Sequence, residues 1–372
     1  MDVLVIGAGV AGLTCAVELA ERGAAVQVLE RNETLGATSC SWFAGGMLAP
    51  WCELETAEPL IADLGTEGIA WWRDRFADTL SLNGSLVLCQ GRESGQLLQF
   101  SRRTQRFEWL DGERIASLEP DLAGRFNKAL LFRDEGHLDP RRALASLVRR
   151  FESLGGRIHH RVRWPIGAGE GGPAGEGGPA GEGGRAGDGG RAGRGNRLGA
   201  PANVPGRWTV DCTGLAARHT LADLRGVKGE MLLVRLPDIC LVRPVRVLHP
   251  RIPVYVVPRA DGLFMIGATV IESDQHTRIR ARSMLELLSA AYALHPAFGE
   301  AEIVEMGTGV RPAFPDNLPR IRRIDHTLYV NGLYRHGFLI APALARRVAD
   351  IVLHDRHFPE VMDEHHRERR LA

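Results

Sequence analysis

The feature that most constrains the fold lies at the N-terminus. A short apolar run over residues 3–6 leads directly into the turn Gly7-Ala8-Gly9-Val10-Ala11-Gly12. An amphipathic helix is expected over 11–20 and a second apolar strand over 26–30. Strand, helix and strand within about 30 residues predict a parallel crossover. A chain that begins in this way is expected to build an α/β domain around a mostly parallel sheet.

The glycines of this turn predict a dinucleotide-binding site. They allow a tight turn, close approach of the backbone to a pyrophosphate, and close packing of the helix on the strand. The pyrophosphate would then meet the free N–H groups and the positive dipole end of the helix. Glu30 ends the second strand, where an acidic side chain accepts hydrogen bonds from ribose hydroxyls. Taken in this order, the elements predict binding of FAD or NAD.

Two later segments favour FAD over NAD. Residues 210–214 are expected to form a strand that ends in Thr213-Gly214, and residues 329–332 a strand that enters a glycine turn before the last helix. FAD is bound in an extended form, so that its flavin ring lies far from the first glycine turn. A flavoprotein is therefore expected to contact its cofactor through segments such as these, which lie far from the glycine turn in the sequence.

Charge and composition exclude several classes of protein. The chain has 46 Lys and Arg against 45 Asp and Glu, and a formal net charge of +1. Binding of nucleic acid needs a clear basic excess, so we expect no nucleic-acid partner. No run of 18 apolar residues is present, which argues against a membrane span. No basic segment precedes the apolar N-terminal run, which argues against a secretory signal. We therefore expect a cytoplasmic protein.

The six cysteines do not form a metal-binding pattern. They stand at positions 15, 40, 52, 89, 212 and 240, without CxxC pairs, and no HExxH sequence occurs. We expect reduced thiols and no metal.

A glycine-rich segment over residues 167–200 interrupts the chain. Within it the hexads GEGGPA, GEGGPA, GEGGRA and GDGGRA follow one another. The segment has no large apolar residue before Leu198, so it cannot bury enough surface to offset the entropy of ordering. We expect a flexible surface insert between strand-like runs at 157–164 and 207–214.

The remaining pattern predicts helices and an antiparallel sheet. A helix is expected over 140–154 with Asp139 as its N-cap, and further helices over 283–294 and 341–353. The β-rich runs at 229–236, 243–249, 253–258 and 263–270 have no helix between them. They are therefore expected to form an antiparallel sheet.

Five segments resemble one flavoprotein family: ATSCSWFAGGMLAP (37–50), GHLDPRRAL (136–144), YVVPRADGLFMIGAT (255–269), GTGVRPAFPDNLPRI (307–321) and NGLYRHGFLIAPALA (331–345). In this order they resemble the glycine oxidase branch of the D-amino-acid oxidase and sarcosine oxidase flavoproteins. The resemblance implies a Rossmann-like FAD-binding domain of the glutathione-reductase type, built from 1–81, 135–224 and 308–372. It also implies an α+β substrate domain with an antiparallel sheet, built from 82–134 and 225–307.

The same resemblance implies the residues that contact substrate. Arg311 matches the arginine that binds the substrate carboxylate, and a planar guanidinium suits a bidentate pair with a carboxylate. Tyr255 matches a tyrosine whose hydroxyl supplements that contact. Arg335 would bind substrate or stabilise negative charge on the reduced flavin. Trp51, near the expected flavin loop, is the tryptophan expected to shape the pocket.

Loops from several parts of the chain would contact FAD. The residues implied are Gly7, Gly9, Val10, Ala11, Gly12, Glu30, Arg31, Thr38, Ser39, Gly45, Gly46, Met47, Val162, Thr213, Gly214, Arg311, Gly332, Arg335, His336, Gly337, Phe338 and Leu339. Relatives with covalent flavin use a cysteine near the segment 307–321, which has none here, or a histidine near the position of Trp42 and Phe43. Cys40 is offset from these positions, so we expect non-covalent FAD.

The activity that the resemblance implies is oxidation of glycine or a small N-substituted glycine. A hydride would pass from the α-carbon to flavin N5, and O2 would be reduced to H2O2. Three alternatives stay open: an oxidase for a bulkier N-carboxymethyl amino acid, a dehydrogenase with another electron acceptor, and an electron-transferring subunit of a complex. Members of the family commonly form homo-oligomers, and we expect one here.

Overall fold

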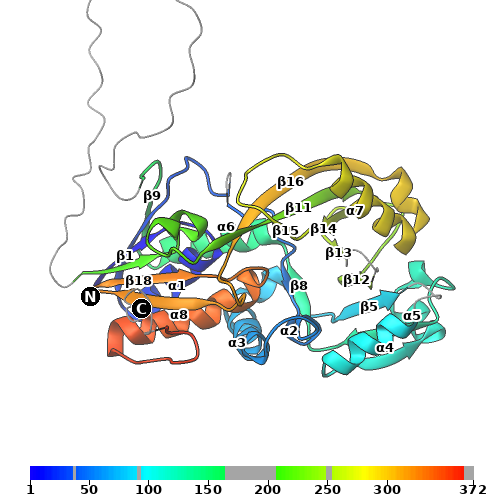
Figure 1. Cartoon of the computed structure of the whole chain (residues 1–372), viewed down its shortest axis with the longest axis horizontal. Helices are drawn as coiled ribbons and strands as arrows, with labels where there is room; N and C mark the ends of the chain where they lie inside the picture. The colour runs from blue at the N-terminus through cyan, green and yellow to red at the C-terminus, as the bar shows by residue number, and fades with distance from the viewer. Residues whose placement is uncertain (37–38, 90–93, 164–206, 249–253, 364–372) are drawn as a thin grey trace, which may run out of the picture.

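The fold is described from a computed structural model, which covers residues 1–36, 39–89, 94–163, 207–248 and 254–363. Within these ranges the strands form three sheets, of six, nine and three strands. Figure 1 shows the six-stranded sheet with its helices at one end of the molecule and the nine-stranded sheet at the other. The prediction of an α/β cofactor-type domain beside a largely antiparallel sheet is confirmed. The glycine-rich insert lies outside the described residues.

The six-stranded sheet has the strand order of a crossover fold. Its strands, in spatial order, are β17 (Arg320–Ile324), β18 (Thr327–Asn331), β10 (Trp208–Asp211), β1 (Asp2–Ile6), β2 (Ala25–Leu29) and β9 (Arg157–His159). All neighbours pair in parallel except β17 and β18, which pair antiparallel. Helix α1 (Val10–Glu21) joins β1 to β2, so the predicted N-terminal crossover is confirmed.

Helices cover one face of this sheet. Helix α1 packs between α6 (Pro140–Ser153) and α8 (Gly337–His354), and α3 (Pro59–Phe76) packs on α8. Val3 and Val5 of β1 point into the core that these helices share. The side chain of Asp139 accepts hydrogen bonds from the backbone N–H groups of residues 141 and 142, which confirms it as the N-cap of α6.

The nine-stranded sheet is antiparallel at all but one pairing. In spatial order it consists of β15 (Ile271–Glu272), β11 (Arg225–Arg235), β14 (Leu263–Gly267), β13 (Val254–Pro258), β12 (Val245–Leu248), β5 (Ser85–Cys89), β7 (Lys128–Phe132) and β6 (Glu108–Asp111), with β16 (Glu302–Ala313) also paired along β11. Only β12 and β5 pair in parallel. The antiparallel arrangement predicted for the four β-rich runs is confirmed.

The strands of this sheet alternate between two environments. Leu232 and Val234 of β11 face a core shared with helix α7 (Ala281–Leu294). Met231 of the same strand faces the opposite side, together with Val257 and Met265. Met231 and Met265 on this second side belong to the wall of the cavity described below.

Smaller elements connect the two large sheets. They are β3 (Met47–Leu48), β8 (Gly136–Leu138) and β4 (Leu80–Ser81) in the three-stranded sheet, and the helices α2 (Pro50–Glu53), α4 (Ser94–Arg103) and α5 (Gly112–Leu118). Strand β3 pairs with β8 and carries the loop before it, residues 43–46, toward the cavity.

Helix α8 starts four residues before the predicted start at residue 341. The prediction was wrong because Pro342 lies inside the helix. Proline has no N–H to donate to the carbonyl four residues earlier, which belongs to Phe338. Trp72 of α3 donates its indole Nε1–H to that carbonyl instead, at 2.8 Å. A contact between helices therefore replaces the missing bond within the helix.

Strand β9 is shorter than the predicted run over 157–164. It ends at His159, and Arg161 adopts a positive φ of 60°, which extended strands do not have.

Strand β16 continues from residue 302 to 313. It therefore crosses residue 308, at which the sequence predicts the last segment of the FAD domain to begin. The domain limits stay a prediction.

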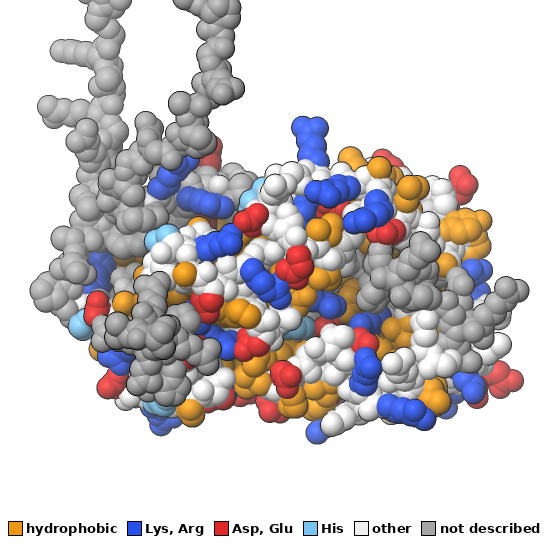
Figure 2. Space-filling view, in the orientation of Figure 1, with side chains coloured by type: hydrophobic (Ala, Val, Ile, Leu, Met, Phe, Trp, Pro, Cys, Tyr) orange, Lys and Arg blue, Asp and Glu red, His pale blue; other side chains and the backbone are white. Residues whose placement is uncertain are grey.

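Charges are mixed on the surface. On the face that Figure 2 shows, acidic and basic side chains are interspersed, in keeping with the nearly balanced composition. Among the described residues, no helix has both the length and the apolar character that a membrane crossing requires.

Candidate active site

A cavity of about 1190 Å³ is lined by residues from both large sheets. It is larger than the roughly 300–1,000 Å³ of a pocket for a drug-sized molecule. One end is lined by Glu30 and Val162 beside β2, and another part by Tyr255 and Arg335. The loop before β3 and the start of α8 also contribute. The cavity therefore has room for an extended ligand and a small second molecule.

The glycine turn after β1 forms part of this wall. Gly7 has a φ of +96°, and a Cβ atom there would lie 2.8 Å from the carbonyl oxygen of Cys212. Gly12 does not line the cavity. A Cβ atom on Gly12 would lie 1.8 Å from the carbonyl oxygen of Gly7, so this glycine permits the helix to pack on the turn. The two positions thus have the turn and packing roles that the sequence predicts.

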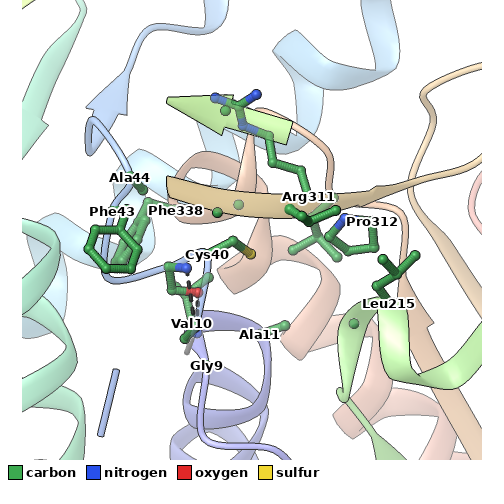
Figure 3. A pocket seen from close by; sticks show the side chains of 18 of the residues that line it. Gly9, Val10, Ala11, Cys40, Phe43, Ala44, Leu215, Arg311, Pro312 and Phe338 are labelled. Carbon is green, nitrogen blue, oxygen red and sulfur yellow. Dashed lines mark hydrogen bonds between the residues drawn. The ribbon is translucent and has the colours of Figure 1, made fainter. Parts of the chain in front are cut away.

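Two helices begin at the cavity. Gly9 is the N-cap of α1 and offers no side-chain cap, and the N–H of Val10 donates to Ser41 Oγ at 3.2 Å. His336 is the N-cap of α8, again without a side-chain hydrogen bond. Figure 3 shows Gly9, Val10 and Ala11 at the start of α1, below Cys40. Backbone N–H groups and positive dipole ends in these two places favour anionic groups of a ligand.

Glu30 directly follows β2, and its carboxylate can accept one more hydrogen bond than the protein supplies. Its Oε2 accepts a hydrogen bond from Ala8 N at 2.9 Å, and Oε1 accepts from Asn32 N at 2.9 Å and from Asn32 Nδ2 at 2.7 Å. A carboxylate can accept about four hydrogen bonds. Glu30 is thus held firmly in the wall and can still accept one from a hydroxyl.

Most residues predicted to bind FAD line this cavity: Gly7, Gly9, Val10, Ala11, Glu30, Arg31, Ser39, Gly45, Gly46, Met47, Val162, Thr213, Gly214, Arg311, Arg335, His336, Gly337, Phe338 and Leu339. Gly12 and Gly332 are not among the lining residues. Gly332 has a φ of +75°, and a Cβ there would lie 2.3 Å from the Phe314 ring. It therefore shapes the turn before α8. Thr38 lies outside the described residues.

Arg311 reaches into the cavity from β16. Figure 3 shows its side chain extending toward the neighbouring strand, β11. A Cβ atom on Gly229 would lie 2.2 Å from Arg311 Nη2, so only glycine leaves room there for the guanidinium. Nη1 donates to the carbonyl oxygen of Thr269 at 3.1 Å. No acidic side chain of the described residues forms an ion pair with Arg311.

The electrostatic state of Arg311 favours an anionic ligand. Removal from water, with the nearby charge of Arg335 as the next cause, lowers the pKa of Arg311 to about 10. The group stays charged at neutral pH, at a cost that a carboxylate ligand would relieve.

A second group of polar side chains lies beside Arg311. Arg335 Nη2 donates to the Tyr255 hydroxyl at 2.7 Å, and this hydroxyl donates to Glu53 Oε1 at 2.8 Å. Glu53 Oε2 lies 3.6 Å from Arg335 Nη2 and 3.7 Å from His336 Nδ1. Tyr255 and Arg335, both predicted as substrate residues, are thus brought together on a buried carboxylate.

Glu53 was missed by the sequence analysis. Burial opposes its ionisation, but Arg335, His336 and Arg246, together with the hydrogen bond from Tyr255, lower the pKa of Glu53 to about 2. It is therefore an anion at neutral pH. The one signal in the sequence was its position, three residues after the segment ending at Pro50 that resembles the flavin loop.

Glu135 holds the short helix that presents Glu53. Its Oε1 accepts from Trp51 N at 2.9 Å and from Cys52 N at 2.6 Å, and its Oε2 accepts from the Ser85 hydroxyl. These bonds attach α2 to the turn between β7 and β8. Side chains far apart in the sequence therefore determine where the Glu53 carboxylate lies.

Two further side chains complete the surroundings of the site. Arg246 pairs across from Tyr255 in the β12–β13 ladder, and its guanidinium lies 5.3 Å from the Tyr255 ring centre. Trp51, which was expected to shape the pocket, does not line the cavity. It packs under Arg106, with 4.4 Å between guanidinium and ring, so that expectation was wrong.

Comparisons with known proteins identify the family of this chain. Residues 2–351 match the family of FAD dependent oxidoreductases, and the chain belongs to this family. A Rhizobium etli protein, whose name assigns it to thiamine biosynthesis as the oxidoreductase ThiO, is 49% identical over 361 residues, or 97% of this chain and 99% of that protein. A glycine oxidase of Bacillus licheniformis is 26% identical, over 95% of this chain and 93% of its own length.

A solved structure agrees on the fold. The crystal structure of a glycine oxidase from Geobacillus kaustophilus superposes with a TM-score of 0.73 at 23% identity, and the match covers 98% of each chain. The protein is therefore an FAD-dependent oxidoreductase, similar in sequence to a ThiO protein and to glycine oxidases.

The residues of the cavity fit FAD. The glycine turn leaves space beside the N-terminus of α1, where a pyrophosphate would lie, and Glu30 has an acceptor for ribose. Gly45, Gly46 and Met47 from one side, and Gly337, Phe338 and Leu339 at the start of α8, would hold the flavin ring. A helix N-terminus beside a ring that gains negative charge on reduction favours that reduction.

Proposed function

We propose that the protein oxidises glycine or a small N-substituted glycine, using non-covalently bound FAD and O2. When bound, FAD supplies the acceptor for the hydride that leaves the α-carbon. The resulting imine is hydrolysed to glyoxylate and ammonia or an amine, and O2 is reduced to H2O2. The similarity to a ThiO protein over nearly the whole chain and to glycine oxidases supports this activity. We also propose that the active form is a homo-oligomer.

The observation that carries the proposal is the guanidinium of Arg311 in the cavity wall, which has no acidic partner in the part of the chain that the structure describes. A guanidinium has five N–H donors, and one hydrogen bond, to Thr269, engages Arg311 among the described residues. The remaining donors suit a bidentate bond to a carboxylate, which fixes its orientation.

The proposed reaction does not need a strong acid or base among the side chains. Hydride transfer needs the α-carbon to be held close to its acceptor and the amine to be unprotonated, and holding the reactants in place supplies much of the rate. Arg311 would fix the carboxylate end of the substrate. The sheet residues Met231 and Met265 would exclude water from the reacting carbon, since both line the cavity and are buried.

The test combines anaerobic reduction of the flavin with the variant Arg311→Ala. In the wild type, glycine or sarcosine should bleach the flavin absorbance without O2, and O2 consumption should produce H2O2. Arg311→Ala should raise KM for glycine at least 100-fold, because a buried charge-assisted pair is lost. Arg323→Ala, an exposed arginine of β17 paired with Asp355, is the matched control and should leave KM unchanged. An unaltered KM in Arg311→Ala would reject the carboxylate contact, and a flavin that no amine bleaches would reject the activity.

A further inference from the structure

The Arg311 guanidinium is held by a carbonyl group that lies behind the cavity wall. Its Nη1 donates to the carbonyl oxygen of Thr269 at 3.1 Å, and this is its one hydrogen bond among the described residues. Thr269 is 4% exposed and is not one of the residues that line the cavity. The position of this carbonyl therefore helps to decide where the remaining donors of Arg311 point.

Two hydrogen bonds fix Thr269 on β11. The N–H of Thr269 donates to the carbonyl oxygen of Glu230 at 3.2 Å, and the N–H of Glu230 donates to Thr269 Oγ1 at 3.0 Å. The preceding residue of β11 is Gly229, where a Cβ atom would lie 2.2 Å from Arg311 Nη2. Figure 3 shows Arg311 extending toward this strand. Strand β11 and the Thr269 carbonyl thus both contact the same guanidinium.

A buried ion pair on β11 holds the same stretch of chain farther along. Lys228 and Glu230 are both buried, and Lys228 Nζ donates to Glu230 Oε1. Lys228 Nζ also donates to Thr277 Oγ1 at 2.9 Å and to the carbonyl oxygen of Arg278 at 3.1 Å. The segment 269–278 is therefore attached to β11 at both of its ends.

Support of this kind matters because a guanidinium binds a carboxylate bidentately in one planar orientation. A side chain that surrounding hydrogen bonds already hold in this orientation loses less freedom when the ligand arrives, and it binds the ligand more tightly. An Arg311 without the fixed carbonyl would keep its charge but lose its orientation.

We propose that Thr269 is a positioning residue for the substrate carboxylate, because its hydroxyl, bonded to the Glu230 N–H, fixes the carbonyl that orients Arg311. This inference rests on the proposed function. Loss of the hydroxyl should weaken binding of the carboxylate. It should not slow the reaction of bound substrate, because Thr269 does not line the cavity in which the reaction takes place.

The variant Thr269→Val tests the proposal, because valine keeps the shape of the side chain but cannot accept from the Glu230 N–H. The KM for glycine should rise about 10-fold, while kcat stays within about twofold of the wild type. Thr269→Ser keeps the hydroxyl and should restore KM.

Thr277→Val is the matched control. It also removes a hydroxyl that bonds to a buried group of β11, but Thr277 has no hydrogen bond to Arg311 among the described residues. It should leave KM unchanged. An equal rise of KM in Thr277→Val and Thr269→Val would show a general structural effect and overturn the inference.

Binding of acetate gives a second readout that needs no turnover. Acetate has the carboxylate but no amine, it cannot be oxidised, and its binding can be followed by the perturbation of the flavin absorbance. The Kd for acetate should rise about 10-fold in Thr269→Val and stay at the wild-type value in Thr277→Val. Unchanged acetate binding in Thr269→Val overturns the inference.

The outcomes separate the two proposals. A wild type that binds acetate but oxidises no amine rejects the proposed function, and the acetate titrations still decide the role of Thr269. A wild type that neither binds acetate nor oxidises an amine rejects both. If Thr269→Val does not retain flavin, Thr269→Ser and Thr269→Cys decide, since the thiol is the weaker acceptor. Weaker acetate binding by Thr269→Cys then supports the inference, and equal binding overturns it.

Discussion

At the scale of single residues, the hydroxyl of Tyr255 shows how a tertiary contact alters a role inferred from sequence. The resemblance implies that this hydroxyl supports the substrate carboxylate. In the structure its one hydrogen is donated to Glu53, and its oxygen accepts from Arg335. While that bond is made, the hydroxyl has no hydrogen left for a carboxylate. Tyr255 then joins Arg335 to Glu53, and the donors of Arg311 that do not bond to Thr269 are left for a carboxylate.

Glu135 leads to a prediction about pH and stability. Burial raises the pKa of Glu135 from its ordinary 4.5 to about 8, although three hydrogen-bond donors favour its charged form. The folded protein then binds one proton more than the unfolded chain between these two values. Its contribution to stability is present below pH 4.5 and is lost as the pH rises to 8.

Glu135→Gln imitates the protonated side chain, since its amide can donate to Ser85 and accept from the start of α2. The free energy of unfolding of this variant, relative to that of the wild type, should increase by about 1 kcal/mol per pH unit between pH 5 and 8. Urea unfolding at several pH values measures the difference. The exposed Glu113→Gln is the control and should show none. A constant difference in Glu135→Gln would mean that Glu135 is ionised throughout this range.

At the scale of elements, two glycines of α3 determine where α8 lies. A Cβ atom on Gly68 would be 1.8 Å from the carbonyl oxygen of Leu339, and one on Gly65 would be 2.9 Å from the Leu339 side chain. A backbone contact of this kind leaves no room for an added side-chain atom, because protein interiors are closely packed. Since Phe338 and Leu339 also line the cavity, the α3–α8 contact positions part of the wall that we propose to bind FAD.

Gly68→Ala should therefore weaken FAD binding as well as the fold. The added methyl group has to push α8 away from α3, and overpacking of this kind costs roughly 1–3 kcal/mol. We expect the Kd for FAD, measured by fluorescence on the apoprotein, to rise at least tenfold. Gly95→Ala in α4, where no atom lies within 4 Å of the new Cβ, is the matched control and should bind FAD normally. Equal affinities would show that α8 can shift without disturbing the site.

At the scale of the whole molecule, the cavity lies where both large sheets contribute residues. The long strands β11 and β16 and the three-stranded sheet join the two parts of the molecule (Figure 1). A ligand that contacts both parts binds only to the folded protein. Such binding stabilises the fold by an amount that grows with ligand concentration.

FAD should thus raise the Tm of the apoprotein as its concentration increases. Each tenfold excess of FAD over Kd should add about 1.4 kcal/mol to the free energy of unfolding.

Acid precipitation should release the flavin into the supernatant and leave a colourless pellet. The reason is that burial raises the pKa of the Cys40 thiol, a lining residue, and a protonated thiol is a poor nucleophile. A yellow pellet would show a covalent bond to the flavin.

Much of the fold could be predicted from local patterns. The N-terminal crossover, the N-cap of α6 and the antiparallel order of β11 to β14 each depend on neighbours in the sequence, and each is confirmed. The predicted start of the last helix was wrong, because the donor that satisfies the Phe338 carbonyl belongs to Trp72, 266 residues earlier. No local pattern contains that information.

The sequence by itself determined the class of the protein and most of the residues predicted for the cofactor that line the cavity, because a glycine turn, a helix N-terminus and an acid at the end of a strand act over short stretches of chain. Only the tertiary structure decided which polar side chains meet in the part of the cavity proposed to bind substrate. There Glu53, Tyr255, Arg311 and Arg335 come from four distant segments, and packing alone brings them together. Charge and hydrogen bonding among such groups depend on burial and on distances of a few ångströms, which a linear sequence does not specify.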